Sequence, residues 1–341
     1  MDCSPVEPVH ISFVVGARND NYGGDLLYRM QVFSDTLLAQ WDRLGLNAEL
    51  IVVEWNPPLD RRRLWQELSW PPRQQHGRVR FIEVPEEIHR RFPNADRMPH
   101  FEYLAKNAGI RRADGEFILA TNPDLVFSEE LMRFISRGGL SDECFYRTNR
   151  YDLACPVPIQ LSLEEKLTFC QRNTFRVHRH QKTVKLYLHR RMIDWIKGMK
   201  NRLMNGLGQG PREEKITNMD DVHTYASGDF LLIAKDAWFE LHGYPDIFTH
   251  SHIDSIMCWA AASLPLKQVV MNRPMCIYHQ EHDRSAHDER PLTEFRPWKE
   301  RVQEALSSGN PLIYNDEDWG LAGEELEEHV LIGSNKTNEN E

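Results

Sequence analysis

The sequence lacks long apolar runs and paired cysteines. No window approaches the roughly 18 uninterrupted apolar residues of a membrane-spanning helix. The first residues, MDCSPVEPVHISFVV, do not show the basic stretch and apolar core of a secretory signal. The six cysteines form no CxxC pair, which argues against a zinc knuckle or a redox dithiol. We therefore expect reduced thiols in a soluble, cytoplasmic protein.

Three common nucleotide-binding or hydrolytic motifs are also absent. No GxGxxG follows the first apolar run, since Gly23 and Gly24 come too late for a dinucleotide-binding turn. The sequence contains no GxxxxGK[ST] phosphate loop and no GxSxG nucleophile elbow. These absences disfavour a Rossmann dehydrogenase, a P-loop enzyme and an α/β-hydrolase.

Charge is unevenly distributed along the 341 residues. The net charge of −10 predicts repulsion of phosphate backbones, so we expect no nucleic-acid partner. Residues 161–215 nevertheless contain 13 Lys or Arg and 5 Asp or Glu, whereas residues 316–341 contain 9 acids and one lysine. Positive and negative charge are therefore gathered in separate segments.

The basic segment belongs to an insertion over residues 155–218 that we expect to be helical. Its best helical pattern carries an apolar stripe at i+3 and i+4 spacing, formed by Leu188, Met192, Ile196, Met199 and Leu203. The stripe either packs on the rest of the protein, leaving a solvated basic face, or residues 184–206 contact an anionic membrane surface or acceptor. The second alternative would make the protein membrane-peripheral.

Elsewhere, β-like and helical patterns alternate. Apolar runs typical of buried strands occur at 10–15, 48–55, 79–84 and 116–122, with helical patterns at 26–44 and 99–113. A second α/β stretch has strand patterns at 230–234, 267–271 and 275–279, and helical patterns at 236–242 and 254–262. We therefore expect an α/β fold with a mostly parallel central sheet, helices on both faces, and ligands beyond the carboxyl ends of the strands.

Polar residues follow several of these strands. Each has an ordinary explanation, because Asn, Asp and Pro are common in turns and helix caps. Together they provide metal-binding chemistry, since a divalent cation on a diphosphate needs few protein ligands when phosphate oxygens and water fill the other positions. The side chains that we single out are Asp124, Asp229, Asp254, His279 and His282.

The order of these segments resembles the GT-A class of nucleotide-sugar glycosyltransferases. The resemblance spans about residues 10–285 without the insertion, and is carried by ISFVVGARND, HFEYLAKNAGIRRADGEFILATNPDLVF, YASGDFLLIAKDAWFELHGYPDIF, HIDS and MCIYHQEHDRS. It is closest to the family-two-like group, while the GYPD segment and the late histidine also resemble galactosyltransferases. It implies transfer of a sugar, a hexose in particular, from a nucleoside-diphosphate sugar to a carbohydrate or other hydroxyl acceptor. Inversion, a role in polysaccharide biosynthesis and dependence on Mn²⁺ or Mg²⁺ are further implications.

The resemblance also implies roles for individual residues. The donor nucleotide would be bound by Ala17, Arg18, Asn19, Glu54, Lys106, Asn107, Asn122 and Asp124. Asn122-Pro123-Asp124 takes the place of the DxD metal motif, with Asn in the first position, and His279 matches the late histidine ligand. Asp124 and His279 are therefore the expected metal ligands.

Asp254 ranks first as catalytic base, ahead of Asp229 and His252, because it occupies an acidic position of the family motif. A positioned base accelerates attack by a hydroxyl roughly a hundredfold to ten-thousandfold. The acid also suits the first turn of a helix for purely structural reasons.

We expect one catalytic domain over residues 1–315. It would comprise a nucleotide-binding half (8–150), the insertion (155–218) and an acceptor-side half (219–315), followed by an acidic, disordered tail (316–341). Two alternatives remain: a catalytically silent binding or scaffold protein, favoured by Asn122 in the DxD position, and a sugar nucleotidyltransferase. The segment GARNDNYGG fits the second alternative poorly.

Overall fold

The computed structural model describes residues 9–72, 74–180, 182–186, 211–246, 252–283 and 296–332. The first half of the chain forms β1 (Ile11–Ala17), α1 (Leu26–Leu44), β2 (Ala48–Trp55), α2 (Leu64–Glu67), β3 (Arg78–Val84), α3 (Glu86–His89), α4 (Glu102–Arg111), β4 (Phe117–Thr121), β5 (Leu125–Phe127), α5 (Glu129–Ser136), β6 (Cys144–Thr148), β7 (Arg150–Leu153) and α6 (Leu163–Arg172). The second half forms β8 (Thr174–Arg179), β9 (Lys182–Lys185), β10 (Arg212–Glu214), the 3-10 turns η1 (Met219–Asp221) and η2 (Ser227–Asp229), β11 (Phe230–Ala234), α8 (Lys235–Glu240), α9 (Ile253–Ser263), β12 (Lys267–Met271), β13 (Ile277–Gln280), α10 (Arg296–Ser308) and β14 (Glu327–Ile332).

The larger sheet has the strand order β10-β12-β6-β11-β4-β1-β2-β3-β14. Strands β4, β1, β2 and β3 run parallel, as the alternating sequence pattern predicts, and β12 also runs parallel to β6. Strand β11 is antiparallel to both neighbours, so the sheet as a whole is mixed. The α/β fold class expected from the sequence is confirmed.

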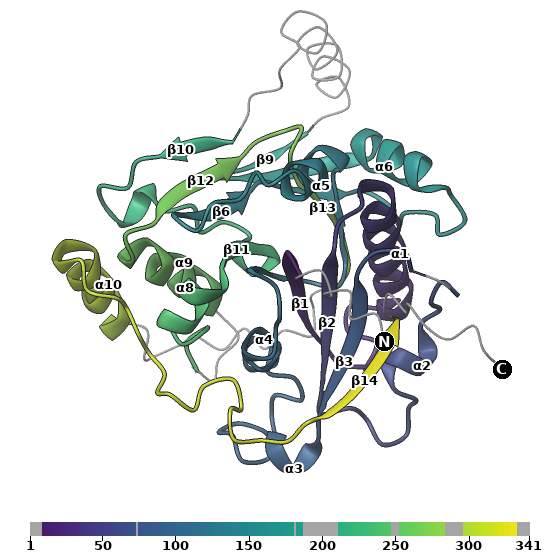
Figure 1. Ribbon diagram of the computed structural model, residues 1–341, viewed down its shortest axis with the longest axis horizontal. Helices are drawn as coiled ribbons and strands as arrows, with labels where there is room; N and C mark the ends of the chain where they lie inside the picture. Colours follow the sequence, from purple (N-terminus) through teal and green to yellow (C-terminus); the bar gives the residue numbers. More distant parts are fainter. Residues whose placement is uncertain are drawn as a thin grey trace, which may run out of the picture.

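Both faces of the large sheet are buried. Alternate residues of β1 enter different apolar clusters: Val14 packs with α4, α8 and α9, whereas Phe13 and Val15 pack with α1 and α5. Figure 1 shows α1 and α4 on opposite sides of the parallel strands. Helix α4 lies close to the sheet because Gly109 has no side chain, and a Cβ there would lie 2.6 Å from Val14 Cγ1. This close packing brings the α4 residues of the KNAG segment to the ends of the strands.

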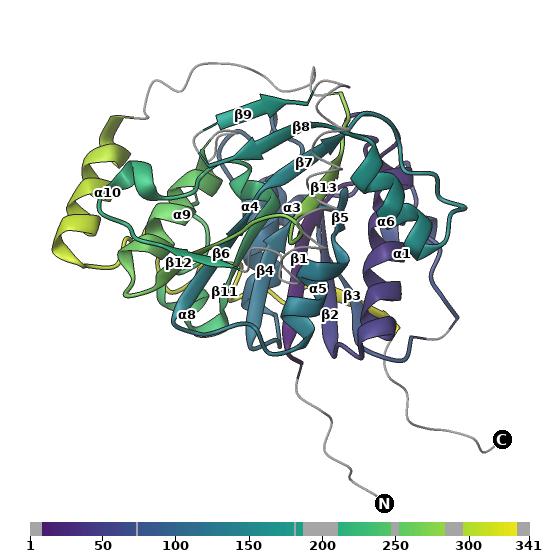
Figure 2. The ribbon, with the colours of Figure 1, turned by 90° about the horizontal axis from the view of Figure 1, so that it is seen from above.

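A smaller sheet has the order β5-β13-β7-β8-β9. Figure 2 shows it beside the large sheet, with β8 and β9 farthest from the core strands. Strand β13 is antiparallel to β5 and parallel to β7, so residues from the middle and the end of the chain become neighbours. The candidate site lies where this sheet meets the end of β4.

The described part of the 155–218 insertion is only partly helical. It contains helix α6, which begins at a Ser162 cap reinforced by Glu165, but also strands β8, β9 and β10. Strands β8 and β9 pair antiparallel, from Arg176 opposite Lys185 to Arg179 opposite Lys182. The helix expected over 184–206 falls largely on residues 187–210, which lie outside the described residues.

The expectation of a disordered tail from residue 316 is wrong for residues 316–332. Trp319 is buried in the core, and β14 pairs antiparallel with β3 at the end of the large sheet. Its acidic composition suits this edge, because Glu328 forms an ion pair with Arg80 of β3 at 2.6 Å. Residues 333–341 lie outside the described residues, so no structural statement applies to them.

Two further observations bear on the sequence analysis. The five cysteines that the structure describes are free thiols, in agreement with the scattered spacing of cysteines in the sequence. Within the described ranges, every helix is too short or too polar to cross a membrane.

Candidate active site

Asp124 and His279 lie side by side although 155 residues separate them in the sequence. Asp124 lies in the turn between β4 and β5, and His279 lies on β13, where it pairs with Leu125. The backbone N–H of Gln280 donates to the Asp124 carbonyl at 3.1 Å, which fixes the register of this junction. The structure therefore brings the two expected metal ligands together.

A second histidine completes the group around the Asp124 carboxylate. Asp124 Oδ2 lies 3.6 Å from His279 Nε2, 3.4 Å from His282 Nε2 and 3.9 Å from Arg29 Nε. Burial alone would raise the pKa of Asp124, but the charges of both histidines and Arg29 outweigh it and hold that pKa well below its usual range. Asp124 is therefore ionised at neutral pH.

The donor atoms of Asp124, His279 and His282 all lie within 4.8 Å of one another. Asp124 Oδ1 is buried and, among the residues that the structure describes, accepts no hydrogen bond. One carboxylate and two imidazoles form a donor set suited to a divalent transition metal such as Mn²⁺. The residues present thus fit a divalent cation, with His282 as a ligand in addition to the two that we expected.

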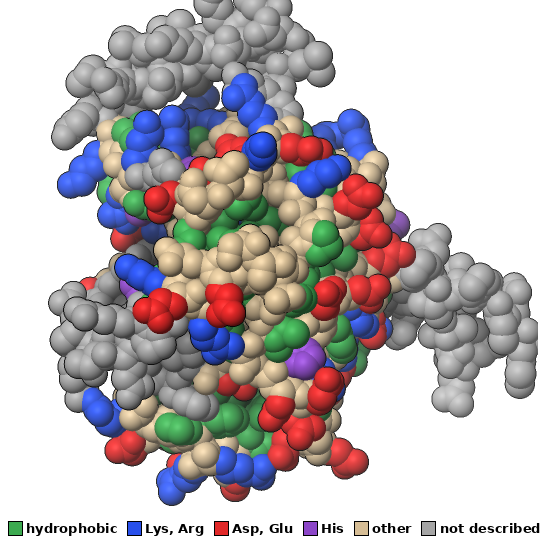
Figure 3. All heavy atoms as spheres, turned by 90° about the vertical axis from the view of Figure 1, so that its left-hand side faces the viewer, with side chains coloured by type: hydrophobic (Ala, Val, Ile, Leu, Met, Phe, Trp, Pro, Cys, Tyr) green, Lys and Arg blue, Asp and Glu red, His purple; other side chains and the backbone are tan. Residues whose placement is uncertain are grey.

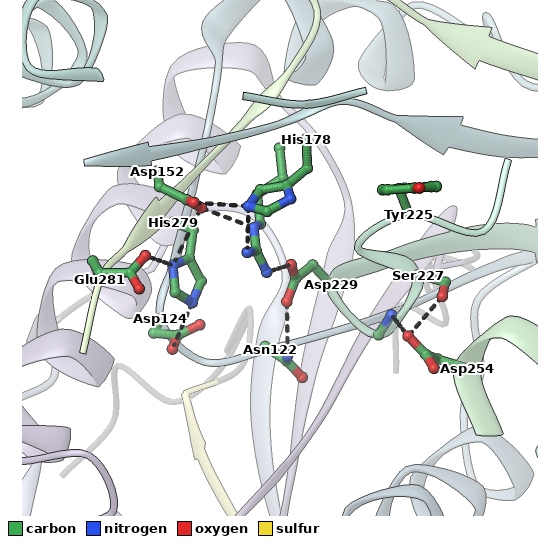
Figure 4. A network of polar contacts seen from close by, with 12 residues as sticks. Asn122, Asp124, Asp152, His178, Tyr225, Ser227, Asp229, Asp254, His279 and Glu281 are labelled. Atoms are coloured by element: carbon green, nitrogen blue, oxygen red, sulfur yellow. Dashed lines mark hydrogen bonds and ion pairs between the residues drawn. The ribbon is translucent and has the colours of Figure 1, made fainter. Parts of the chain in front are cut away.

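The opposite edge of the His279 ring faces two more carboxylates. His279 Nδ1 lies 3.6 Å from Asp152 Oδ1 and 3.6 Å from Glu281 Oε2. A carboxylate on the far nitrogen of a metal-binding imidazole fixes the ring orientation and its tautomer. Asp152 and Glu281 lie within ion-pair distance of one edge of the His279 ring, while its Nε2 faces Asp124, as Figure 4 shows.

Asp152 lies at the centre of a buried charge network. It contacts Arg150 at 2.9 Å and His178 at 2.9 Å, and also forms an ion pair with Arg176. Burial would raise the pKa of Asp152, but the His178 hydrogen bond and the Arg150 charge hold it far below its ordinary value. Arg150 then extends the network to Asp229, whose Oδ2 lies 2.7 Å from Arg150 Nη1.

Asn122 connects this network to helix α4. Its amide nitrogen donates to Asp229 Oδ1 at 2.8 Å, and its amide oxygen accepts from Lys106 Nζ at 2.7 Å. An aspartate at position 122 would place a second carboxylate against Asp229 and could not donate to it. This double role explains the departure from DxD, and it assigns Asn122 to positioning rather than to metal binding.

Asp254 differs from Asp229 in how its carboxylate is used. Asp229 is almost fully buried and paired with Arg150, which holds its pKa low against the effect of burial. Asp254, in the first turn of α9, stays partly exposed. Its Oδ2 accepts from the Ser227 hydroxyl at 2.6 Å and from the Gly228 N–H at 2.8 Å. A carboxylate that is oriented, exposed and free of a cation within ion-pair distance among the described residues has the properties of a general base.

His252, the other candidate base, is exposed and precedes α9 with a φ of 65°. Nothing in its position favours it over Asp254.

The residues that we expect to bind the nucleoside lie at the ends of β1 and β2, where Ala17 pairs with Glu54. Arg18 Nε donates to the Asn56 carbonyl at 2.7 Å, and Asn19 donates to the Arg62 carbonyl at 2.8 Å. The structure therefore brings these four residues together, although several of their polar atoms hold the neighbouring loops.

Glu54 is the unusual member of this group. It accepts from the Leu64 N–H at 2.8 Å, while its Oε1 is buried and has no hydrogen-bond partner among the described residues. Burial raises the pKa of Glu54 to about 7, against the smaller opposing effects of the Leu64 N–H and the Arg63 charge. A carboxyl that is partly protonated near neutrality can both donate and accept hydrogen bonds.

Lys106 and Asn107 point to different parts of the molecule. Lys106 Nζ is fully buried and donates to Glu102 at 2.6 Å and to the Gly228 carbonyl at 2.9 Å, as well as to Asn122. Asn107 bonds both the N–H and the carbonyl of Tyr244, at 2.7 and 2.8 Å, and so holds the GYPD turn. The structure thus separates Asn107 from the residues that surround Asp124.

A cavity of about 430 Å³ adjoins the metal-binding group. Arg29 and His282 line it together with Gly23, Gly24 and Gln280. It lies between the start of α1 and the end of β13, and Asp25 and Glu281 also line it.

Sequence reasoning missed several residues of the site. Arg29 belongs to the helical pattern of 26–44 but lies on the buried face of α1, and Arg150 and Asp152 lie on a strand that we did not anticipate. The alternating charges of the segment NRYDL are the one signal that pointed to β7, since side chains two apart in a strand share a face. His282 was singled out but not assigned a role.

Comparisons with known proteins were made on sequence and on structure. No family model and no curated protein sequence matches the chain. Among solved structures it is similar to residues 1–349 of Staphylococcus aureus TarS in complex with UDP-GlcNAc, with 13% identity, coverage of 91% of this chain and 69% of that one, and a TM-score of 0.49. It is also similar to the catalytic domain of Drosophila beta1,4-galactosyltransferase 7 in complex with xylobiose, with 12% identity, coverage of 86% and 79%, and a TM-score of 0.39.

At this level of identity the likeness concerns the fold alone. The parallel strands β3, β2, β1 and β4, the antiparallel strand β11 beside them, and the helices on both faces form the architecture that the sequence led us to expect. The likeness is therefore one of architecture: a large mixed sheet with helices on both faces.

Proposed function

We propose that this protein transfers a sugar from a nucleoside-diphosphate sugar to an acceptor hydroxyl, with inversion and with a divalent cation. The observation that carries the proposal is the group formed by Asp124, His279 and His282, of which His282 also lines the cavity between the start of α1 and the end of β13. In open α/β sheets this edge is where ligands bind. Bound there, a divalent cation would stabilise the negative charge of the departing diphosphate.

The chain's own residues have distinct roles in this scheme. Asp124, His279 and His282 would hold the cation, while Asp152 and Glu281 keep the His279 ring oriented. The strand ends with Arg18, Asn19 and Glu54 would receive the nucleoside. Asp254 would take the proton of the acceptor hydroxyl, because its carboxylate is held by two hydrogen bonds and is partly exposed.

Turnover of UDP-sugars tests the proposal. UDP-GlcNAc, which the TarS fragment binds, is the first donor to try, together with UDP-glucose and UDP-galactose. The purified full chain is incubated with each donor, Mn²⁺ and a panel of oligosaccharides, and released UDP is measured. We expect UDP release that requires Mn²⁺.

Asp254→Asn should lower kcat roughly a hundredfold to ten-thousandfold while leaving the Kd for UDP unchanged, because a base acts in the transition state. Asp236→Asn, which replaces an exposed acid in the first turn of α8, is the matched control and should retain most of the turnover. If wild-type protein binds UDP but releases none from any donor, the protein is a catalytically silent binding protein. If His252→Ala shows the large loss and Asp254→Asn does not, the base is wrongly assigned.

A further inference from the structure

A groove of the described molecule lies apart from the candidate donor site. It has a volume of about 960 Å³ and opens beside η1 and helices α9 and α10. Figures 1 and 2 both show α9 and α10 side by side at the end of the molecule away from α1. A groove of this volume accommodates an extended ligand of several rings.

Aromatic side chains line one part of the groove. The rings of Trp259 and Trp298 are stacked, with centroids 4.7 Å apart and an interplanar angle of 22°. Trp259 Nε1 donates to the Met219 carbonyl at 3.0 Å, which fixes the indole in place. Tyr225 also lines the groove, and its side chain is one of the few large apolar side chains that are exposed among the described residues, at 38%. Rigid aromatic faces suit ligands that have a flat apolar face and a polar edge.

The polar lining consists mainly of uncharged side chains that donate and accept hydrogen bonds: Thr217, Asn218, Thr224, Ser255, Gln303 and Ser307. Among the described lining residues, the charged ones are Asp220 and Lys299, of opposite sign, and His252 adds an imidazole. Recognition of a phosphate or carboxylate uses clustered arginines or lysines. The groove therefore suits an uncharged ligand rich in hydroxyl groups.

Figure 3 views the molecule from the left-hand side of Figure 1 and shows acidic and basic side chains mixed over much of this face.

One end of the groove reaches the candidate base. Ser255 lines the groove and follows Asp254 directly in α9. On the other side, the carbonyl of Thr224, also a lining residue, lies 2.8 Å from the Ser227 hydroxyl, and that hydroxyl lies 2.6 Å from Asp254 Oδ2. A ligand bound along the groove would therefore lie near the residues that hold the Asp254 carboxylate.

We propose that this groove binds the acceptor, and that the acceptor is an uncharged saccharide whose sugar rings pack on Tyr225 and Trp259. The inference rests on the proposed transferase function and names its second substrate. In the transfer, the acceptor hydroxyl gives its proton to Asp254 and its oxygen forms a bond to the anomeric carbon. The bond from that carbon to the diphosphate oxygen breaks, and its electron pair leaves with the nucleoside diphosphate.

Saturation-transfer NMR on the full chain tests the groove with named probes. The neutral probes are cellotetraose, chitotetraose and xylotetraose, and the anionic comparison is a hyaluronan tetrasaccharide. We expect at least one neutral tetrasaccharide to bind, and Tyr225→Ala and Trp259→Ala each to weaken that binding by about tenfold or more. Trp65→Ala is the matched control, because Trp65 stacks on His329 near the opposite end of the large sheet. It should bind the saccharide as wild type does.

Affinity for UDP and Mn²⁺, measured on the same variants, should stay at the wild-type value. Should Trp259→Ala fail to fold, the exposed Tyr225 still tests the groove. The proposal is overturned if no neutral tetrasaccharide binds, if the anionic probe binds more tightly, or if Tyr225→Ala binds as wild type does. If saccharide binding depends on Tyr225 but no UDP-sugar is turned over, the proposed transferase function is contradicted. The groove then remains a saccharide-binding site.

Discussion

Replacing Arg150 with methionine should destabilise the protein severely. The Arg150 side chain is 8% exposed and pairs with two carboxylates, Asp152 at 2.9 Å and Asp229 at 2.7 Å. Methionine fills similar space but supplies no positive charge. Asp152 keeps its contacts with Arg176 and His178, whereas Asp229 keeps the Asn122 amide but loses its cation.

Removing one partner of a buried ion pair costs about 3–5 kcal/mol, because the other charge stays buried without compensation. We expect a loss of this size in the free energy of unfolding, measured by urea denaturation followed by tryptophan fluorescence. It is a large fraction of the roughly 5–15 kcal/mol that stabilises a typical protein.

Arg176→Met is the matched control. Arg176 also pairs with Asp152, but its side chain is 23% exposed and water compensates part of the loss, so we expect a cost of about 1 kcal/mol. Adding Asp229→Asn to Arg150→Met should restore part of the stability, since the double variant no longer buries that unpaired charge. Equal losses in Arg150→Met and Arg176→Met, or a loss below about 1 kcal/mol in Arg150→Met, would refute the argument.

Two further predictions concern Glu54 and Asn122. Because burial raises the pKa of Glu54 from 4.5 to about 7, stability that is present in acid should be lost as the pH rises through that interval, by about 3 kcal/mol. Glu54→Gln should remove this slope in unfolding experiments at pH 5 and pH 8, and an unchanged slope would contradict the assignment. Asn122→Asp, which restores the DxD pattern, should lower the thermal midpoint because its carboxylate would face Asp229; a midpoint equal to wild type would show that the Asn122 bridge contributes little.

Local pattern predicted much of the fold. The helix expected at 26–44 and the strands expected at 48–55, 230–234 and 267–271 have the observed bounds, because each combines a clear apolar period with a turn residue at its end. Helix α1, for example, ends at Gly45, whose left-handed conformation lets its N–H reach the Trp41 carbonyl.

The pairing of strands from distant parts of the chain could not be predicted from the sequence. The acidic segment 327–332 forms a strand because β3 offers it an edge and Arg80 offers it a countercharge, neither of which is a local property. The smaller sheet was missed for the same reason, since β5, β7 and β13 are short and come from distant parts of the chain.

The site residues divide in the same way, into those with a local sequence signal and those that depend on distant contacts. Asp124 and His279 could be proposed as site residues because each follows or ends a recognisable strand. Asp254 could be proposed because it lies at the beginning of a helix. Arg150 and Asp152 were missed, because a charged residue in a strand gives no sign of which distant charge it will meet. Asn107 was misplaced because adjacent residues of a helix point about 100° apart, so its neighbour Lys106 reaches Asn122 while Asn107 holds the Tyr244 turn.

Calorimetric titration of UDP into the wild-type chain and Asp124→Ala, each with Mn²⁺ and with EDTA, tests the central claim most directly. Asp124 is buried against Arg29 and His279, so circular dichroism first verifies that Asp124→Ala is folded at the temperature of the titration. We predict that wild-type protein binds UDP in the presence of Mn²⁺, and that EDTA or Asp124→Ala abolishes this binding. UDP binding of equal strength with and without Mn²⁺, or unchanged in Asp124→Ala, would contradict the assignment of Asp124, His279 and His282 to a metal-dependent donor site.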